Sequence, residues 1–140
     1  MIHHNVMQVR WDDLDAFGHI NNAAYLTFVQ EARADFTWYA RKIRGESPIL
    51  TDMVVARAEV DYLEPIYEGG IEVDVAISVA RIGQASFDLN YEISRGDVVH
   101  ARAKTVQVAV SMETKRSRPL SDEERNFLTR YLAEPLKGTE

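Results

Sequence analysis

The sequence predicts an α+β fold in which one antiparallel sheet wraps around one long helix. Apolar residues recur at helical spacing in one early segment, whereas in four later segments they alternate with polar residues, as strands with one buried face do. Pairs of residues containing glycine separate the later segments, which favours tight turns between antiparallel strands. A sheet with one apolar face and a helix with one apolar stripe bury both by packing together.

The N-terminal segment predicts a short strand. Apolar and polar side chains alternate over Asn5–Trp11, which places Met7, Val9 and Trp11 on one side. We therefore expect these three side chains to face the core.

The long helix is expected over about Asn22–Tyr39. Asn21 or Asn22 is a suitable N-cap, because a short amide side chain can accept a hydrogen bond from a free N–H group of the first turn. Gly45 and Pro48 mark its end. The side chains expected to face the core are Tyr25, Phe28, Val29, Ala32, Phe36 and Tyr39.

Four strands are expected after the helix: Ala56–Tyr62, Ile71–Val79, Phe87–Ile93 and about Val98–Met112. The turns between them contain Gly69-Gly70, Gly83-Gln84 and Gly96-Asp97. This order predicts a meander in which each strand pairs with the next. Ala56 and Ala58 are small, so we expect the helix to lie close to the sheet there.

A short closing helix is expected after Ser121. Ser121 and Glu124 match a capping box, in which each residue satisfies a free backbone N–H near the other, and the helix would direct Phe127, Leu128 and Tyr131 inward. No linker, repeat or low-complexity stretch divides the chain, so we expect residues 1–140 to form a single domain.

The composition excludes several function classes. The chain has no cysteine, which rules out thiolate nucleophiles, disulfides and cysteine zinc sites. Its net charge of −6, with no basic stripe, argues against nucleic acid as a partner. No apolar run is long enough to span a membrane and the start lacks the features of a signal peptide, so we expect a soluble, cytoplasmic protein. The histidines lack metal-ligand spacing, and neither a metal nor another cofactor is expected.

The loop over residues 11–22 contains most of the groups able to do chemistry. It carries three carboxylates, one histidine, one glycine and two asparagines directly before the helix. The free N–H groups and positive dipole end of a helix N-terminus can polarise a carbonyl oxygen, and a nearby carboxylate can activate water or attack the carbonyl carbon. Asp15 is the candidate for that carboxylate, and the alternative is that it only caps the helix or ties the loop.

The same loop carries a family resemblance. Val9-Arg10-Trp11-x-Asp13-x-Asp15-Ala16-Phe17-Gly18-His19-Ile20-Asn21-Asn22-x-x-Tyr25-Leu26, followed by Glu31-Ala32-Arg33, resembles the opening signature of the 4-hydroxybenzoyl-CoA thioesterase family, and is closest to its long-chain acyl-CoA and Tol-Pal-associated branches. Weaker similarities are Asp61-Tyr62-Leu63-x-Pro65 and Thr114-x-Arg116-x-Arg118-Pro119-Leu120. The resemblance implies a hotdog fold and hydrolysis of acyl-CoA or acyl-carrier-protein thioesters in lipid metabolism. It also implies paired protomers, as a homodimer or a dimer of dimers, with active sites at the interface.

The resemblance also implies roles for three residues. The catalytic aspartate falls on Asp15, as general base or nucleophile. Asn22 falls at the helix start, where the thioester carbonyl is held, and His19 matches a histidine that has been given a catalytic part in the longer-chain branch and in the similar plant acyl-carrier-protein thioesterases. Other members of the family with different residues at this place still hydrolyse thioesters.

Other residues are candidates for binding the substrate: Gly18, Phe17, Tyr25, Arg57 and Arg116. The closer resemblance to the acyl-CoA branch, with the aromatic residues Phe17, Tyr25 and Phe28, favours an aliphatic acyl group of medium to long chain. The arginines, with Lys104 and Arg118, could contact the phosphates of coenzyme A. Asp12 and Asp13 are expected to be solvent-facing loop carboxylates, and Glu31 to be structural, near a pairing with Arg33 or with strand residues.

Two other functions stay open at this point. One is a hotdog hydratase or dehydratase, although the His with Asp or Glu of those enzymes is not found in a matching motif. The other is an acyl-thioester-binding module without turnover, which would have no need of a carboxylate beside the thioester. A serine triad is not expected, because no G-x-S-x-G elbow is present.

Overall fold

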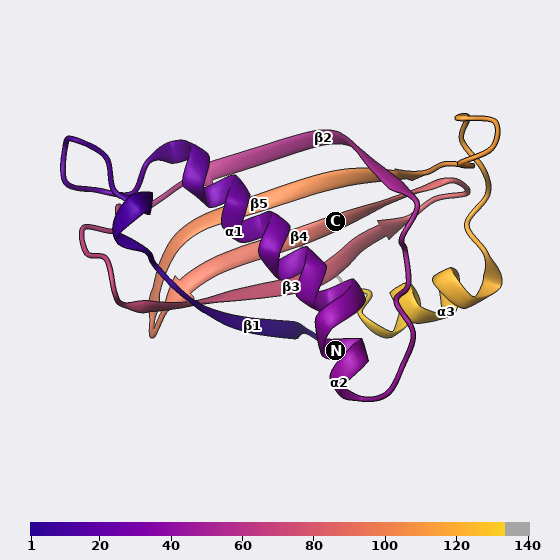
Figure 1. Ribbon diagram of the computed structural model, residues 1–140, viewed down its shortest axis with the longest axis horizontal. Coiled ribbons are helices and arrows are strands. Elements are labelled where there is room, and N and C mark those ends of the chain that lie inside the picture. The colour runs from indigo at the N-terminus through magenta and orange to yellow at the C-terminus, as the bar shows by residue number, and fades with distance from the viewer. Residues whose placement is uncertain (134–140) are drawn as a thin grey trace, which may run out of the picture.

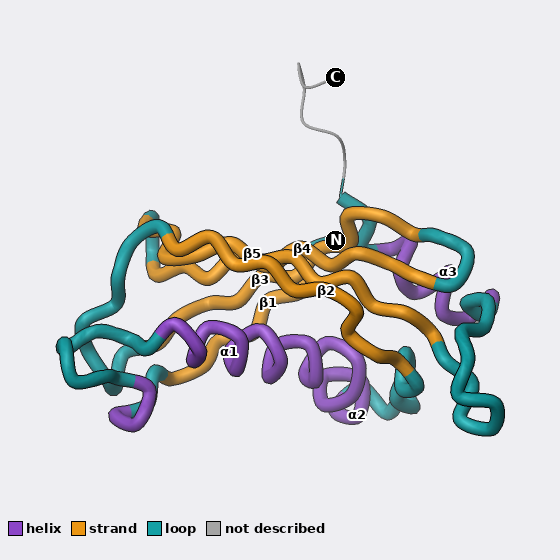
Figure 2. The backbone as a smooth tube through the Cα atoms, turned by 90° about the horizontal axis from the view of Figure 1, so that it is seen from above, coloured by secondary structure: helices purple, strands orange, loops and turns teal. Residues whose placement is uncertain are grey.

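The fold consists of two layers, a five-stranded antiparallel sheet and a long helix that crosses one of its faces (Figures 1 and 2). The computed structural model describes residues 1–133. The strands are β1 (His3–Gln8), β2 (Met53–Tyr62), β3 (Glu72–Ile82), β4 (Ser86–Arg95) and β5 (Val98–Ala109). The helices are α1 (Asn22–Ala34), α2 (Ala40–Ile43) and α3 (Asp122–Arg130), and a π-helical turn, Asp35–Tyr39, joins α1 to α2. This is the α+β arrangement that the sequence predicts.

The long helix begins and ends where the sequence indicates. The Asn21 side chain accepts a hydrogen bond from the Ala23 N–H at 2.9 Å, so Asn21 is the N-cap, and Gly45 with φ of 77° follows the last turn. Five of the six predicted core residues of the stripe are buried. Tyr39 is 55% exposed instead, because the π-helical turn changes the helical spacing before that position.

The core lies between α1 and the inner face of the sheet. The side chains of β3 and β4 that face α1 are fully buried: Val73, Val75, Ile77, Val79, Phe87, Leu89, Tyr91 and Ile93. The helix packs on β3 and β1. The β2 side of the inner face is left uncovered, since every residue of β2 is exposed or half-exposed.

The predicted meander is correct for β3, β4 and β5 and wrong for β2. The strand order is β1-β3-β4-β5-β2, so β2 pairs with β5 and forms one edge of the sheet, while β1 forms the other. The chain runs from β2 at one edge to β3, which lies next to the opposite edge strand β1, and this connection is anchored by the buried Ile66, whose carbonyl accepts a hydrogen bond from the Ile20 N–H at 2.9 Å. Ala56 and Ala58 are exposed, which contradicts a close approach of the helix there.

Two terminal predictions have different outcomes. Trp11 does not face the core: it is 83% exposed, because β1 ends at Gln8 and Trp11 begins a 3₁₀ turn. The closing helix α3 is confirmed, with the Ser121–Glu124 capping box formed. Its expected inward side chains are buried: Phe127, Leu128 and Tyr131.

Candidate active site

The loop before α1 is held in place by its own backbone. Leu14 and Ile20 form an antiparallel bridge, and the Asn21 N–H donates to the Asp13 carbonyl at 2.9 Å. These contacts close the loop into a small hairpin whose two ends lie side by side. Asp15, one residue beyond the first end of the bridge, is therefore kept close to the start of the helix.

Asp13 is part of this support and is not the solvent-facing carboxylate that the sequence suggests. It is only 3% exposed. Its two oxygens accept hydrogen bonds from the Arg10 N–H at 2.8 Å and from Nη2 of Arg10 at 2.7 Å. Arg10 is the basic partner that allows a carboxylate to be buried here.

Asp15 presents one fixed and one available carboxylate oxygen. Its Oδ1 accepts the Phe17 N–H at 2.9 Å, and its backbone carbonyl accepts the Gly18 N–H at 3.1 Å. Gly18 has φ of 81°, a conformation that favours glycine, so this tight turn explains why glycine stands there. Within residues 1–133, His19 is the one side chain that pairs with Oδ2, at 3.6 Å, and the Asp15 side chain is 23% exposed. The carboxylate is thus oriented without being sealed off.

His19 lies beside Asp15 and is also tied to the backbone. Its Nδ1 is 3.2 Å from the Ile20 carbonyl oxygen and 3.6 Å from Oδ2 of Asp15. The Phe17 ring stacks on the imidazole at 6.3 Å between centroids and is 84% exposed. The structure therefore brings Asp15, Phe17 and His19 together in one exposed loop.

Asn22 is the first residue of α1 and offers a free donor. Within residues 1–133, its backbone N–H has no hydrogen-bond acceptor, whereas the neighbouring N–H groups of Asn21 and Ala23 are both satisfied. The Tyr62 hydroxyl donates to the Asn22 carbonyl at 3.2 Å, which links the end of β2 to the start of the helix. A free N–H at a helix N-terminus is suited to a carbonyl oxygen that gains negative charge.

Tyr25 is a wall of this region and not an exposed contact. It is 3% exposed and packs edge-on against Tyr62 at 5.2 Å. Burial, with Tyr62 nearby, raises the pKa of its phenol, so Tyr25 is neutral at physiological pH.

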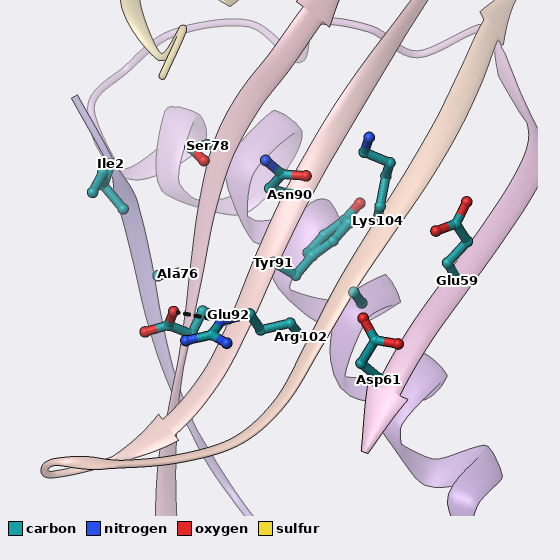
Figure 3. A pocket seen from close by; sticks show the side chains of 11 residues that line it. Ile2, Glu59, Asp61, Ala76, Ser78, Asn90, Tyr91, Glu92, Arg102 and Lys104 are labelled. Carbon is teal, nitrogen blue, oxygen red and sulfur yellow. Dashed lines mark hydrogen bonds and ion pairs between the residues drawn. The ribbon is translucent and has the colours of Figure 1, made fainter. Parts of the chain in front are cut away.

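Arg57 lies on the other face of the sheet. Its side chain is 70% exposed and pairs with Glu59 at 2.8 Å. Figure 3 views this outer face, where a polar hollow of about 460 Å³ is lined by Glu59, Lys104 and others, with α1 behind the sheet. The hollow contains none of the residues of the 11–22 loop.

Arg116 lies at the opposite end of the same protomer from Asp15. It follows the end of β5, which pairs with Met53 at the start of β2, whereas Asn22 is bonded to Tyr62 at the end of β2. The two ends of the ten-residue strand are nine residue steps apart, which is about 30 Å. Within one protomer the structure does not bring Arg57 or Arg116 to Asp15.

A polar group at the far half of α1 was missed from the sequence. Nη1 of Arg33 donates to the Tyr91 hydroxyl at 3.2 Å, and that hydroxyl is 2.8 Å from Oγ1 of Thr105. Gln107, 4% exposed, lies on the same strand face as Thr105. Two polar residues at inward positions of an otherwise apolar strand face were the available signal.

The described residues offer neither a metal site nor a membrane span. Among residues 1–133, no group of three or more His, Cys, Asp or Glu side chains is placed to hold a metal ion. In the same part of the chain, no helix is both long and apolar enough to cross a membrane.

The sheet wrapped around a helix, with a carboxylate loop at the helix start, defines the class of hotdog-fold hydrolases. The chain matches the thioesterase-like superfamily over residues 9–128 and belongs to that family. A 1,4-dihydroxy-2-naphthoyl-CoA hydrolase of Nostoc punctiforme is 28% identical over 123 residues, which are 82% of this chain and 78% of that protein.

Two solved structures show the same fold. A protein of Bacillus stearothermophilus described as a predicted thioesterase superposes with a TM-score of 0.82 at 28% identity, over 96% of this chain and 99% of that one. A thioesterase of Thermus thermophilus complexed with coenzyme A and Zn has a TM-score of 0.76 at 30% identity, over 94% of this chain and 95% of that one. The hotdog fold and a thioester hydrolase are thus both confirmed.

Proposed function

We propose that the protein hydrolyses acyl-CoA thioesters, with Asp15 as the catalytic carboxylate and the start of α1 as the group that polarises the carbonyl. The observation that carries this proposal is that one loop and the helix start after it present both an oriented, partly exposed carboxylate, Asp15, and a free backbone N–H, that of Asn22. The matched CoA hydrolase of Nostoc punctiforme supports coenzyme A as the carrier. An acyl carrier protein is the other carrier that the family resemblance allows.

The chemistry needs one water molecule for each thioester. As a general base, Asp15 takes a proton from water while the water oxygen attacks the thioester carbon, and the carbonyl oxygen becomes an oxyanion held by the Asn22 N–H. The carbon–sulfur bond then breaks, and the thiolate of CoA leaves and takes up a proton. As a nucleophile, Asp15 attacks the carbon itself, expels the thiolate and forms an anhydride that water hydrolyses. In either route His19 orients the groups around Asp15.

We further propose that the working unit is a homodimer joined through β2, or a tetramer built from such dimers. In the part of the chain that the structure describes, the ten residues of β2 leave one row of backbone N–H and C=O groups without a strand partner. The strand contains no proline, and its register shift lies between Val55 and Arg57. Two copies related by a two-fold axis would pair these edges antiparallel. The Met53 end of one strand would then lie beside the Tyr62 end of the other.

This pairing would also complete the site. Arg116 follows the strand that pairs with Met53, so the partner's Arg116 would approach the Asp15 end and could contact a phosphate of coenzyme A. Residues of the predicted site that lie about 30 Å apart within one protomer would meet across two protomers. Lys104, like Arg57, lies on the outer face and has no part in this arrangement.

The dimer is tested by placing a charge at the middle of the proposed edge. Ala58→Lys puts two ammonium groups close together at the two-fold axis, and like charges directly opposite destabilise a strand pair. We expect light scattering to give about 32 kDa for a dimeric parent, twice the 15.9 kDa of the chain, or about twice that mass for a tetramer, and a smaller mass with loss of turnover for the variant. Val6→Lys, on the opposite edge strand β1, is the matched control and should leave the mass unchanged. A parent that is monomeric and fully active would contradict the proposal.

The activity is tested by thiol release from acyl-CoA esters of graded length, aromatic esters included. Turnover that depends on Asp15 supports the hydrolase. Tight binding of the esters without thiol release would favour the non-catalytic binding module, and addition of water to an enoyl ester would favour the hydratase. The preferred chain length in the same series tests the proposed assignment to the long-chain acyl-CoA and Tol-Pal-associated branches. We also propose that the protein is cytoplasmic.

A further inference from the structure

A second hollow lies beside the far half of α1 and is lined by the guanidinium of Arg33, which has no carboxylate partner among residues 1–133. It has a volume of about 210 Å³ and is lined by Gln30, Arg33, Thr37, Met53, Val55 and Gln107, among others. Arg33 is half-buried, and among residues 1–133 no carboxylate lies within 4.0 Å of its guanidinium. Glu31, the expected partner, is exposed and lines a different hollow, next to β1.

The donors of Arg33 are mostly unused. The guanidinium carries five N–H groups, and the hydrogen bond to Tyr91 uses one. Tyr91 then accepts from Arg33 and is free to donate to Thr105, since burial raises the pKa of Tyr91 and keeps its phenol protonated. The Tyr91 and Thr105 hydroxyls thus hold the Arg33 side chain in place and leave its other N–H groups available to the hollow.

Gln107 adds a second polar group on the opposite wall. It is 4% exposed, it lines the hollow, and within the described residues its side-chain amide makes no hydrogen bond. A ligand that fills the hollow excludes water from this amide, so it must supply the hydrogen bonds itself. The helix is also altered here, because Arg33 and Thr37 flank the start of the π-helical turn, a feature frequent at functional sites.

We propose that this hollow binds a carboxylate at the far end of the acyl group, so that the preferred substrate is the CoA thioester of a dicarboxylic acid. Arg33 pairs with the carboxylate, and the Gln107 amide donates to it. The inference rests on the proposed function and deepens it. It replaces the aliphatic acyl group expected from the family resemblance and from the aromatic residues near the loop, since an alkyl end would exclude water from both polar groups without replacing its hydrogen bonds.

The proposed dimer places this hollow next to a thioester site. Within one protomer, Arg33 is eleven residues beyond Asn22, about 16 Å along the helix. Across the paired β2 edges, Met53 and Val55, which line the hollow, would lie opposite the Tyr62 end of the partner strand and thus near the start of the partner's helix. The hollow therefore receives the acyl group that is hydrolysed at the partner's loop.

The test compares matched pairs of substrates. Hexanoyl-CoA and adipyl-CoA have six-carbon acyl groups and differ by the terminal carboxylate, and benzoyl-CoA and 4-hydroxybenzoyl-CoA differ by a neutral hydroxyl. We expect kcat/KM to be at least about 10-fold higher for adipyl-CoA than for hexanoyl-CoA, the size of effect of one hydrogen bond to a charged group. Arg33→Met should bring the ratio of the two kcat/KM values close to one, because adipyl-CoA loses its cationic partner and the alkyl end of hexanoyl-CoA no longer meets an unpaired guanidinium. Arg33→Lys should restore part of the preference. Arg95→Met, an exposed arginine at the end of β4, is the control.

Several results would overturn the inference. Equal rates for the first pair, or a preference for hexanoyl-CoA, would remove the anion site, and an Arg33-dependent preference for 4-hydroxybenzoyl-CoA over adipyl-CoA would mean that the hollow binds a neutral hydroxyl. A lower mass of Arg33→Met in light scattering, with unchanged selectivity, would make Arg33 an interface residue. Binding measured on Asp15→Asn separates the two proposals: if the parent hydrolyses no thioester but adipyl-CoA still binds more tightly through Arg33, the proposed function fails and the carboxylate site stands.

Discussion

Asp15→Asn separates a catalytic carboxylate from a structural one. The hydrogen bond from the Phe17 N–H at 2.9 Å reaches Oδ1, and the asparagine carbonyl oxygen can keep it. What the substitution removes is the charge and the acceptor at Oδ2, which lies 3.6 Å from His19. The loop should therefore keep its shape while it loses the group proposed to act on water or on the thioester.

Asp15→Asn is expected to change the activation free energy by several kcal/mol more than it changes the free energy of unfolding. Loss of a general base lowers the rate by about 10² to 10⁴, which is about 2.7 to 5.4 kcal/mol of activation free energy. The free energy of unfolding should change by about 0.5 kcal/mol or less, as for other substitutions that leave a hydrogen bond in place. For a chain of this size that change moves the melting temperature by about 1 to 3 °C.

The assay is thiol release under saturating acyl-CoA, with thermal melting of each variant with and without ligand. Asp12→Asn is the matched control, because Asp12 is an exposed carboxylate of the same loop. His19→Ala should give a smaller defect than Asp15→Asn if it only orients the groups around the thioester. An Asp15→Asn variant that keeps about half of the parental rate would refute the mechanism and leave His19 or Glu31 as the candidate. A variant that melts more than about 10 °C lower would show that Asp15 holds the loop.

Three further predictions concern the stability of the Asp13 loop, the pH dependence of melting and the sharing of active sites between protomers. Asp13→Ala should lower the free energy of unfolding by about 1 to 3 kcal/mol in a denaturant titration, because it removes the hydrogen bonds that this buried carboxylate accepts from Arg10. Burial raises the pKa of Glu124, but hydrogen bonds from Arg118 and Ser121 outweigh burial and hold that pKa below its usual 4.5. The stability that the Glu124 carboxylate contributes is therefore complete above pH 4.5 and is lost as the pH falls through the lowered pKa. The melting temperature of Glu124→Gln should depend less steeply on pH below about pH 4.5. Co-expression of Asp15→Asn with Arg33→Met should restore adipyl-CoA turnover, because a mixed dimer holds one site with both native groups; separate sites within each protomer would give no recovery.

The long helix and the closing helix were predictable because their signals are local. Helical spacing, an Asn21 cap, a glycine with positive φ and the Ser121 capping box all act within one or two turns, and the structure has each of them. The same holds for β3, β4 and β5, whose alternation and tight turns predict both the strands and their pairing. The loop of Asp15 was also identified from its composition.

The position of β2 was decided by the tertiary structure. Its alternation resembles that of the other strands, but a strand does not encode which neighbour it pairs with. The connection through Ile66 separates β2 from β3, and β2 pairs with β5 at the edge of the sheet instead. That placement exposes β2 and separates Arg116 from Asp15 within one protomer. The prediction that both belong to one site therefore depends on a second copy of the chain.

The amino-acid sequence by itself determined the elements, the family and the loop that carries Asp15, because each depends on short-range spacing. Only the tertiary structure decided which polar groups are buried and which are satisfied. Asp13 became a buried support through Arg10, and Arg33 lost its expected partner and turned toward Tyr91 and the hollow beside Gln107. Burial and pairing depend on residues distant in sequence, and no local pattern contains that information.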